Sequence, residues 1–254
     1  MLAEERHRKI CETVLSRGTV TTVELMELLD ASESTVRRDL AELEQRRRLV
    51  RVHGGASRIG NGYVLRDQAL DEKHFLHASE KQTIASFAAS LIKPGDFVYL
   101  DAGSTTEALA DCIEERDATY LTNSLPIARK LLARGCKTLL PGGTVKPLTE
   151  ALVGEETIAS LTKYHFTIGF WGTNGFSPKT GFTTPELSEA KVKEFSIAQT
   201  LKPYVLCDSS KLSKVSLVTF AKAGDATIIC DHVPEGSGLA GLDSLIELEP
   251  AISA

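Results

Sequence analysis

Residues 32–45 combine hydroxyl and guanidinium side chains with an apolar helical period. Val36, Leu40 and Leu43 fall at i, i+4 and i+7, which predicts a helix with one buried stripe. Guanidinium groups bind guanine edges or phosphates, and hydroxyls add short-range contacts in a major groove. An Arg-Arg pair on a helix is more often a solvated face, so the flanking sequence has to decide between the two interpretations. The side chains predicted on or beside the outer face are Ser34, Thr35, Arg37 and Arg38.

A second polar group follows a predicted strand at 97–100 and reads Asp101-Ala-Gly-Ser-Thr-Thr106. Gly103 would allow a tight turn, and the hydroxyls with the first N–H groups of the next helix would cradle an anion. No lysine follows as in a Walker A loop, and the G-x-G-x-x-G spacing is absent. A simple Ser/Thr helix cap would use the same residue types, so support has to come from other strand ends.

Small and polar residues also follow four later predicted strands. In open α/β sheets ligands bind outside the carboxyl ends of the strands, where these residues would meet. Such a set suits a small polyhydroxylated phosphate, with N–H groups for the phosphate and Asp, Asn and Lys for the hydroxyls. Glu186, Glu189 and Lys193 share a helix face and could close the site, although Glu189 and Lys193 also fit a routine i,i+4 surface pair. The strand-end segments are 122–124, 142–143, 172–175 and 208–211.

The elements that would position the arginine-bearing helix form a small N-terminal unit. Residues 3–17 predict a first helix ended by Gly18. Thr21 and Glu24 match a capping box that opens a second helix. Ser32 is a good N-cap for the third helix. Two short helices joined by about three residues predict a helix-turn-helix.

A wing is predicted after these helices. The strand-like run at 49–53 is followed by Gly54-Gly55 and another short run, which would place Arg51 and His53 near phosphates. Residues 31–60 hold seven arginines and four acidic residues, a local charge of +3 in a chain of net charge −5. A basic module on an acidic body would confine nucleic-acid contact to one place. A small helical bundle that binds protein is the alternative.

The rest of the chain predicts a larger α/β unit. Residues 57–78 show no clear period and predict a linker or hinge. A helix then begins at Glu80-Lys81, and the alternation that follows implies a mostly parallel sheet. The tail after Pro234 shows no clear pattern. Strands are predicted at 97–100, 119–122, 137–140, 166–171, 204–207 and 227–230, with helices at 105–113, 126–133, 155–161 and 185–200.

Composition narrows the class of protein. No apolar run approaches the ~18 residues that cross a bilayer, and the charged start does not match a secretory signal. Five scattered cysteines without a C-x-x-C predict reduced thiols and a cytoplasmic location. His74 and His77 are the closest histidine spacing, and with no partner ligand they predict no metal site.

Two long motifs carry a resemblance to a known family. Ser-x-Ser-Thr-Val-Arg-Arg-Asp-Leu followed by Leu-Val-Arg-Val-His-Gly-Gly-Ala56 resembles the DNA-binding head of the DeoR family of bacterial transcription regulators. Further family-like motifs (Asp-Ala-Gly-Ser-Thr-Thr, Leu-Thr-Asn-Ser, Pro-Gly-Gly, Phe-Thr-Thr-Pro-Glu and Asp-Ser-Ser-Lys) extend the resemblance over roughly residues 1–232. It implies a winged helix-turn-helix at 1–58, a linker at 59–78, and at 79–254 a mostly parallel α/β domain similar to the ribose-5-phosphate isomerase-like fold. That domain would bind a sugar phosphate and oligomerise.

The resemblance also implies a function and a set of contacts. The protein would be a sequence-specific repressor of a sugar-catabolism operon. Its partners would be operator DNA, a phosphorylated sugar such as fructose 1-phosphate or another ketose or hexose phosphate, and further copies in a dimer or tetramer. It would have no cofactor, catalytic residue, metal or membrane partner. DNA contacts would fall on Ser32, Ser34, Thr35, Arg37, Arg38, Arg51 and His53, with Arg38 at base edges. Effector contacts would fall on Asp101, Gly103, Ser104, Thr105, Thr106, Asn123, Ser124, Gly142, Lys193 and Lys211, to which the strand-end argument adds Gly143, Asn174 and Asp208.

Two other functions stay open at this stage. One is an aldose–ketose isomerase with Asp101, Glu186 or Asp208 as general base and Lys211 as electrostatic stabiliser. The other is a sugar-phosphate sensor whose head binds another protein. One departure weighs against the isomerase: Thr167-Ile-Gly-Phe170 stands where many family members carry Asp-Lys-Ala-Phe. Loss of that acid would weaken any isomerase activity and alter which sugar fits.

Overall fold

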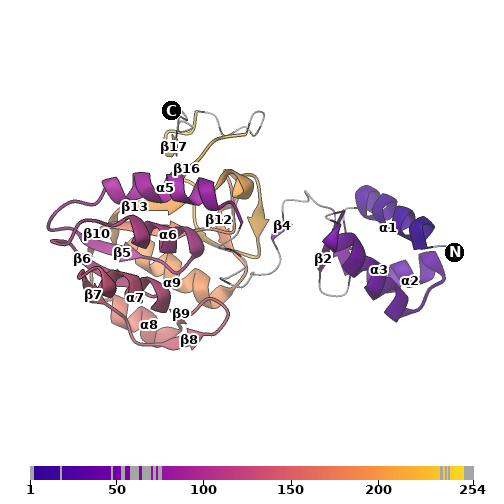
Figure 1. Cartoon of the computed structure of the whole chain (residues 1–254), viewed down its shortest axis with the longest axis horizontal. Helices are drawn as coiled ribbons and strands as arrows, with labels where there is room; N and C mark the ends of the chain where they lie inside the picture. Colours follow the sequence, from indigo (N-terminus) through magenta and orange to yellow (C-terminus); the bar gives the residue numbers. More distant parts are fainter. Residues whose placement is uncertain are drawn as a thin grey trace. The chain divides into compact units, whose positions relative to one another are not determined.

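The computed structural model of the chain (Figure 1) divides into two compact units, Met1–Tyr63 and Val64–Ala254, called here the head and the body. The division falls within the predicted linker at 59–78. The residues that the structure describes are 3–17, 19–46, 48–52, 55–57, 63–64, 70, 73, 76–234, 237, 239 and 241–248. Within these ranges, no helix has the length and apolar character that crossing a membrane requires.

The head is a winged helix-turn-helix, as predicted. The side chain of Thr21 and that of Glu24 complete the predicted capping box. The Oγ of Ser32 accepts from the Thr35 amide at 3.4 Å and caps the third helix. The predicted positions Gly18, His53 and Gly54 lie outside the described residues. Three helices, α1 (Ala3–Arg17), α2 (Thr22–Leu29) and α3 (Glu33–Gln45), accompany an antiparallel sheet of order β1-β3-β2, with β1 (Thr19–Thr21), β2 (Val50–Val52) and β3 (Gly55–Ser57).

The head is held together by one apolar cluster. Val36, Leu40 and Leu43 of α3 are buried, which confirms the predicted stripe. They share the cluster with residues of α1 and α2. A Cβ on Gly55 would lie 2.1 Å from the carbonyl oxygen of Val20, so the pairing of β1 with β3 requires glycine there.

A seven-stranded parallel sheet forms the centre of the body. From its first strand, β5, the chain builds outward to one edge and then returns to β10 on the other side of β5. The strand order therefore reverses between β5 and β10, and a crevice is expected outside their carboxyl ends. The order is β17-β16-β13-β10-β5-β6-β7, with β5 (Phe97–Leu100), β6 (Thr119–Thr122), β7 (Lys137–Leu139), β10 (Phe166–Gly172), β13 (Thr200–Leu206), β16 (Thr227–Cys230) and β17 (Leu245–Glu247).

Helices cover both faces of this sheet. On one face α5 (Ala78–Ser90), α6 (Ser104–Cys112) and α7 (Leu125–Ala133) bury an apolar cluster. On the other, α8 (Glu155–Leu161) and α9 (Leu187–Ala198) pack with the antiparallel sheet β11-β12-β15. The smaller elements are β11 (Gly175–Ser177), β12 (Gly181–Thr184), β15 (Val218–Ala221), the pair β8 (Thr144–Lys146) and β9 (Ala151–Val153), the pair β4 (Tyr63–Val64) and β14 (Val215–Ser216), and the 3-10 turn η1 (Ser209–Lys211).

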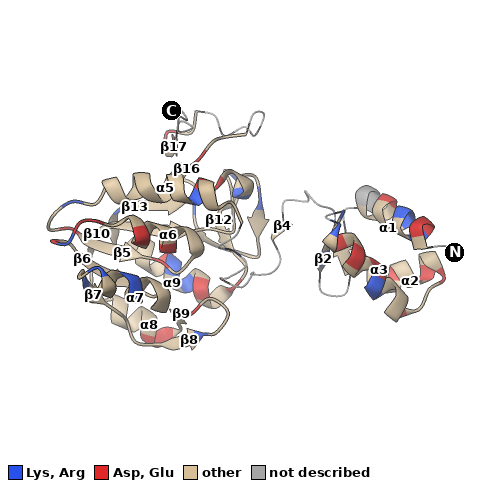
Figure 2. Ribbon diagram, in the orientation of Figure 1, with Lys and Arg blue, Asp and Glu red and all other residues tan. Residues whose placement is uncertain are grey.

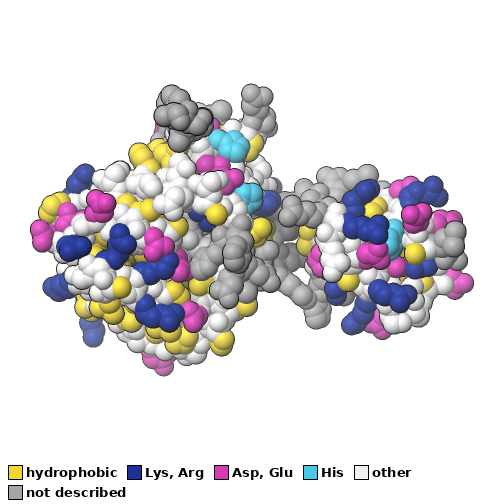
Figure 3. Space-filling view, in the orientation of Figure 1, with side chains coloured by type: hydrophobic (Ala, Val, Ile, Leu, Met, Phe, Trp, Pro, Cys, Tyr) yellow, Lys and Arg dark blue, Asp and Glu magenta, His cyan; other side chains and the backbone are white. Residues whose placement is uncertain are grey.

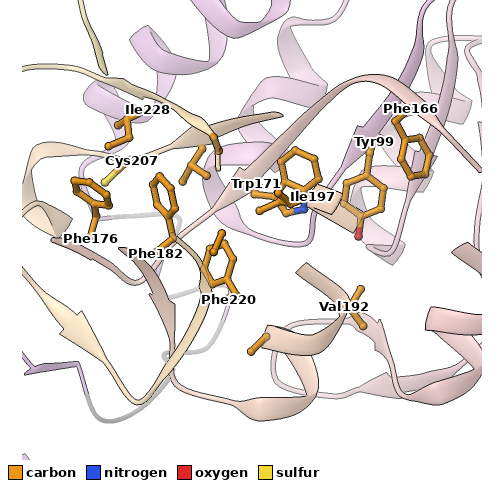
Figure 4. Close-up of a cluster of buried hydrophobic side chains, with 14 of the residues drawn as sticks. Tyr99, Phe166, Trp171, Phe176, Phe182, Val192, Ile197, Cys207, Phe220 and Ile228 are labelled. Carbon is orange, nitrogen blue, oxygen red and sulfur yellow. The ribbon is translucent and has the colours of Figure 1, made fainter. Parts of the chain in front are cut away.

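Aromatic packing fixes α9 against the sheet. The rings of Tyr99 and Trp171 are stacked with centroids 5.2 Å apart, and Figure 4 shows them beside Ile197. The indole Nε1 of Trp171 donates to the Oγ of Ser196 on α9 at 2.9 Å, which satisfies a buried donor. This contact holds Lys193, one turn earlier on α9, against the carboxyl ends of β5 and β10.

The regular elements follow the sequence prediction closely, and the short ones do not. All six predicted strands of the sheet are present, although β13 begins at Thr200 instead of 204. The sequence did not predict β17 or the small strands β4, β8, β9, β11, β12, β14 and β15. These have two to four residues each, too few to show an alternation of apolar and polar side chains.

Candidate functional site

The exposed face of α3 carries the side chains predicted to contact DNA. Ser32 and Ser34 are exposed, and the Oγ of Ser32 lies 3.0 Å from that of Ser34 and 2.9 Å from the Oγ1 of Thr35. Arg37 is exposed and forms a 2.5 Å ion pair with Glu33. Arg38 is also exposed, and within the described ranges its guanidinium forms no ion pair. Among the residues that the structure describes, no carboxylate therefore competes for the Arg38 guanidinium.

The wing is tied to α3 through Arg51. Its backbone amide donates to the Oε1 of Glu44 at 2.8 Å, which orients β2 against the end of α3. The Arg51 side chain is exposed, as a phosphate contact requires, whereas His53 lies outside the described residues. Figure 3 shows Lys and Arg side chains on the visible face of the head, and Figure 2 shows that α1 and α3 mix basic and acidic residues.

A buried ionic cluster that the sequence did not predict orients α3. The carboxylate of Asp39 accepts from Arg6 Nε at 2.6 Å and Nη2 at 3.0 Å and lies 3.2 Å from His7 Nε2. Burial by itself would raise the pKa of Asp39, but the bonds and charges of Arg6 and His7 lower it overall. Asp39 directly follows Arg37 and Arg38, and no local spacing in the sequence indicates that its partners lie on α1. Arg6, His7 and Asp39 hold α3 on α1.

In the body, a cavity lies where the strand order reverses. It brings together loops after β5, β10 and β13, which are distant in sequence, as the strand-end argument predicted. Thr149 and Glu189 contribute from the side of β8, β9 and α9. Of the predicted effector residues, those that line the cavity are Gly103, Ser104, Thr105, Asn174, Lys193, Asp208 and Lys211.

Asp101 and Lys193 form a buried ion pair behind this cavity. Lys193 Nζ donates to Asp101 Oδ2 and to the carbonyl of Gly172 at 3.2 Å, and the Gly172 amide donates to the same Oδ2 at 3.2 Å. Burial raises the pKa of Asp101, and the ammonium of Lys193 opposes the rise. The pair links the loops after β5 and β10 and leaves Lys193 as a wall of the cavity.

Glu189 does not form the surface pair with Lys193 that its spacing favoured. Its Oε1 accepts from Lys146 Nζ at 2.9 Å and from Thr149 Oγ1 at 3.0 Å. Glu186, one turn earlier, lies 3.0 Å from the same Lys146 and is more exposed. Lys146 on β8 was not predicted and is the cation that holds both glutamates.

Three predicted residues with polar side chains sit behind the cavity and hold its loops. Asn123 accepts from the Ala102 amide at 3.0 Å and donates to the Leu152 carbonyl at 3.2 Å. Ser124 caps α7, and Thr106 donates to the Gly103 carbonyl at 2.9 Å.

Gly142 and Gly143 also lie outside the cavity lining. The Gly142 amide donates to Ser160 Oγ at 3.2 Å, and its carbonyl accepts from Thr157 Oγ1 at 2.9 Å. Gly143 has a φ of 136°, and a Cβ there would lie 1.9 Å from Thr157 Oγ1. Gly143 is therefore required by the packing of this turn onto α8.

The start of α6 faces the cavity through Gly103, Ser104 and Thr105. Among the described residues, no side chain caps this helix start, so its first N–H groups are available to an anion. The predicted reason for glycine at 103 was wrong. Its φ of 166° is ordinary extended backbone, and an added Cβ would only reach Thr106 Oγ1 at 3.4 Å.

The sequence missed a second set of cavity residues within and after the predicted linker. Leu70, Lys73, Leu76 and His77 line the cavity, as does Lys81 on α5. The cavity walls thus include four lysines, Lys73, Lys81, Lys193 and Lys211, against two carboxylates, Glu189 and Asp208. The surplus of positive charge favours an anionic ligand. The burial of Lys81 could have been predicted from the sequence, since Lys81 shares one apolar face of α5 with Ile84 and Ala88.

Thr167, the position that departs from the family motif, does not line the cavity. Thr167 lies at the amino end of β10, whereas the cavity lies at the carboxyl ends. Its Oγ1 donates to Asp96 Oδ1 at 2.7 Å and accepts from the Phe97 amide at 3.0 Å. It connects the amino ends of β5 and β10.

Comparison with known families agrees with both units. A DeoR-like helix-turn-helix domain matches residues 6–61, and a DeoR C-terminal sensor domain matches residues 76–232. The chain belongs to the DeoR family. It is thus a DNA-binding transcription regulator with a sensor domain, and the isomerase and the protein-binding head are not supported.

Relatives match along nearly the whole chain. An uncharacterized HTH-type transcriptional regulator, FruR of Bacillus subtilis (strain 168), is 39% identical over 236 residues, 92% of this chain and 93% of the relative. The lactose phosphotransferase system repressor of Streptococcus mutans is 33% identical over 251 residues, 98% of this chain and 99% of the relative. A solved ribose 5-phosphate isomerase from Methanocaldococcus jannaschii matches 52% of this chain and 53% of its own at 18% identity, with a TM-score of 0.40. A match at that TM-score carries no functional conclusion.

Proposed function

We propose that this DeoR-family regulator represses a sugar-catabolism operon and releases its operator when a phosphorylated sugar binds the cavity of the body. The observation that carries the proposal is the cavity itself. Four lysines and an uncapped helix start suit a phosphate dianion, and carboxylate and amide groups suit hydroxyls. The name of one relative, the lactose phosphotransferase system repressor, supports a sugar taken up by a phosphotransferase.

In this proposal α3 enters the major groove. Arg38, with Ser34, contacts base edges, because its guanidinium has no competing carboxylate among the described residues. Arg37 contacts phosphates, with Arg51 and His53 from the wing. Ser32 and Thr35 lie at the start of α3, where hydroxyls and amides approach the backbone of DNA.

The effector would bind with its phosphate at the start of α6 and its hydroxyls toward Asn174, Asp208 and Glu189. Lys193 and Lys211 would balance the charge of the phosphate. The remaining predicted contacts would act by holding the loops: Asp101, Thr106, Asn123, Ser124, Gly142 and Gly143. The ligand would be a ketose or hexose phosphate such as fructose 1-phosphate.

Binding to an operator with two half-sites would also require two heads, one from each of two copies of the chain. Helix-turn-helix regulators read two half-sites about one helical turn or a multiple apart, so the body would assemble a homodimer or homotetramer. A DNA-binding regulator works where the chromosome lies, which keeps the cytoplasm as the proposed location.

A gel-shift titration tests the proposal directly. Purified full-length protein is titrated onto DNA from upstream of its own operon, at fixed salt, with a panel of hexose and ketose phosphates and the unphosphorylated sugars as controls. Release by one sugar phosphate but not by its free sugar supports the proposal. Specific binding that every sugar phosphate leaves unchanged removes the effector assignment and keeps the DNA-binding head.

A further inference from the structure

Lys81 connects the cavity to the chain segment that precedes α5. It lies on the buried face of α5 with 6% of its surface exposed, and it also lines the cavity. Its ammonium donates to the backbone carbonyl of Lys73 and, at 2.6 Å, to that of Leu76. One buried cation thus faces the ligand space and holds two carbonyls of the segment leading to the head.

Other contacts tie the same segment to the rim of the cavity. The Leu70 amide donates to the Leu148 carbonyl at 3.4 Å, next to the cavity residue Thr149. His77, directly before α5, adopts the left-handed conformation at φ 53° and also lines the cavity. Non-glycine residues hold that conformation only where surrounding contacts impose it, and such positions are common at ligand clamps and switches. The described residues 70, 73, 76 and 77 therefore form one wall of the cavity.

Within the described ranges, the Lys81 ammonium is held by two backbone carbonyls and forms no ion pair. Burial lowers the pKa of Lys81, and the cations Lys211 and Lys73 lower it further, while the carboxylates of Asp208 and Glu80 oppose this. Two neutral carbonyls compensate a buried charge less well than an anion does. A phosphate dianion in the cavity would therefore attract this ammonium more strongly than the carbonyls do.

We propose that Lys81 is a shared ligand: it holds the carbonyls of Lys73 and Leu76 in the structure described, and it transfers its hydrogen bonds to the phosphate of the bound sugar. The transfer unties the segment before α5, which is the covalent path to the head. This inference rests on the proposed function and adds the residue through which occupancy of the cavity is coupled to DNA binding. A ligand changes an equilibrium only by contacting two states differently, and the Lys81 ammonium supplies that difference.

The test compares Lys81→Met with the wild-type chain and with Lys211→Met. Lys211 lines the same cavity, but within the described ranges its side chain makes no hydrogen bond, so its removal takes away one ammonium without untying the segment. Operator affinity of the full-length proteins is measured by fluorescence anisotropy with and without saturating fructose 1-phosphate, or whichever sugar phosphate releases the wild type. Binding of that compound is measured separately by calorimetry.

Lys81→Met is expected to bind the operator more weakly than the wild type even without the sugar phosphate. Its ratio of affinities with and without the compound is expected to fall close to one, from the ~5–150-fold that allosteric coupling typically gives. Lys211→Met is expected to bind the sugar phosphate more weakly but to keep the wild-type ratio at saturation. A Lys81→Met protein that keeps the full ratio overturns the inference, while the proposed function stands. If no sugar phosphate changes the operator affinity of the wild type, both the proposed effector and this inference are wrong.

Hydrogen exchange on the wild type keeps the inference testable even if Lys81→Met does not fold. The amides of Leu70 and Lys81 donate to the Leu148 and His77 carbonyls at the two ends of the segment. Their exchange is expected to accelerate when the sugar phosphate binds. Unchanged exchange at a calorimetrically saturated site overturns the transfer.

Discussion

The head and the body each bury a carboxylate beside a cation, but the two pairs have different surroundings. Asp39 in the head accepts from Arg6, whose side chain is 13% exposed, and its pKa is lowered. Asp101 in the body accepts from Lys193, whose side chain is 6% exposed, and its pKa is raised by burial. The surroundings of Asp39 therefore favour its ionised form, whereas the burial of Asp101 disfavours its ionised form.

The cations in the two pairs also differ in their other contacts. Arg6 and His7 turn toward Asp39 and hold α3 on α1, a structural task. Lys193 contacts Asp101 and also lines the cavity, where the proposed function places the anionic effector. The ionic contacts of the head thus lie within its helices, whereas those of the body include a cation that also lines the cavity.

Asp101→Asn should have the largest effect on stability. It leaves the Lys193 ammonium buried without its carboxylate, and breaking such a pair typically costs about 3–5 kcal/mol. Trp171 is the single tryptophan and stacks on Tyr99 in the body, so its fluorescence during urea unfolding measures the loss. Asp111→Asn, which removes an exposed ion pair with Lys130, is the matched control and should cost at most ~1 kcal/mol. Equal losses in the two variants would contradict the assignment of Asp101.

Asp39→Asn should destabilise the head by about 1.5–3 kcal/mol, the range for hydrogen bonds to charged groups. Operator binding should weaken as α3 loosens, although Asp39 does not contact DNA. The Trp171 transition should not move, because Trp171 belongs to the body, while far-ultraviolet circular dichroism should show earlier loss of helix. Glu12→Gln on the exposed surface of α1 serves as the control. A shifted Trp171 transition would mean that the head and body do not unfold separately.

Arg38→Ala should leave stability within ~0.5 kcal/mol, since the side chain is exposed. It should cost ~1–3 kcal/mol of operator affinity and relax base preference at one position of each half-site. Arg37→Ala should weaken specific and non-specific DNA by similar factors and reduce the salt dependence of binding. Competition titrations with operator and random DNA separate the two outcomes. If Arg38→Ala weakened operator and random DNA equally, Arg38 would be the phosphate contact and the proposed base contact would be wrong.

Mild acid should have the smallest effect and should begin in the head. The folded pKa of Asp39 lies below its ordinary value of 3.8, so its stabilisation is complete above that value and is lost as pH falls through the folded pKa. Because the folded pKa of Asp39 lies below 3.8, only part of the Asp39 carboxylates is protonated between pH 5 and pH 3, so the change is smaller than in Asp39→Asn, which removes the charge completely. Hydrogen exchange of α3 amides from pH 5 to pH 3 checks this, and the wild type should approach the variant at the acid end.

The comparison also shows where prediction from the sequence succeeded. The Thr21–Glu24 capping box, the Ser32 cap and the buried face of α3 were all predicted and are present, because each depends on residues at most a few positions apart. The convergence of strand ends was predicted from topology, and seven of the predicted effector residues line the cavity.

The other predictions failed because the residues concerned contact partners that are distant in the sequence. The spacing of Glu189 and Lys193 favoured a surface pair, yet Lys193 reaches Asp101, 92 residues away. Residues 70–77 resembled a linker because they are polar and aperiodic, but the described ones among them line the cavity. Local spacing cannot distinguish a solvated segment from one held by a buried lysine.

By itself the sequence determined the helix-turn-helix, the alternation of strands and helices and the chemistry available at the strand ends. These properties follow from helix caps, apolar periods and turn residues, which act over a few positions. The tertiary structure alone decided which charges are buried together: Asp39 with Arg6 over 33 residues, Asp101 with Lys193, and Lys81 with the segment before α5. A buried charge is stable only beside partners that the folded chain brings within hydrogen-bond distance, and those partners can come from any part of the sequence.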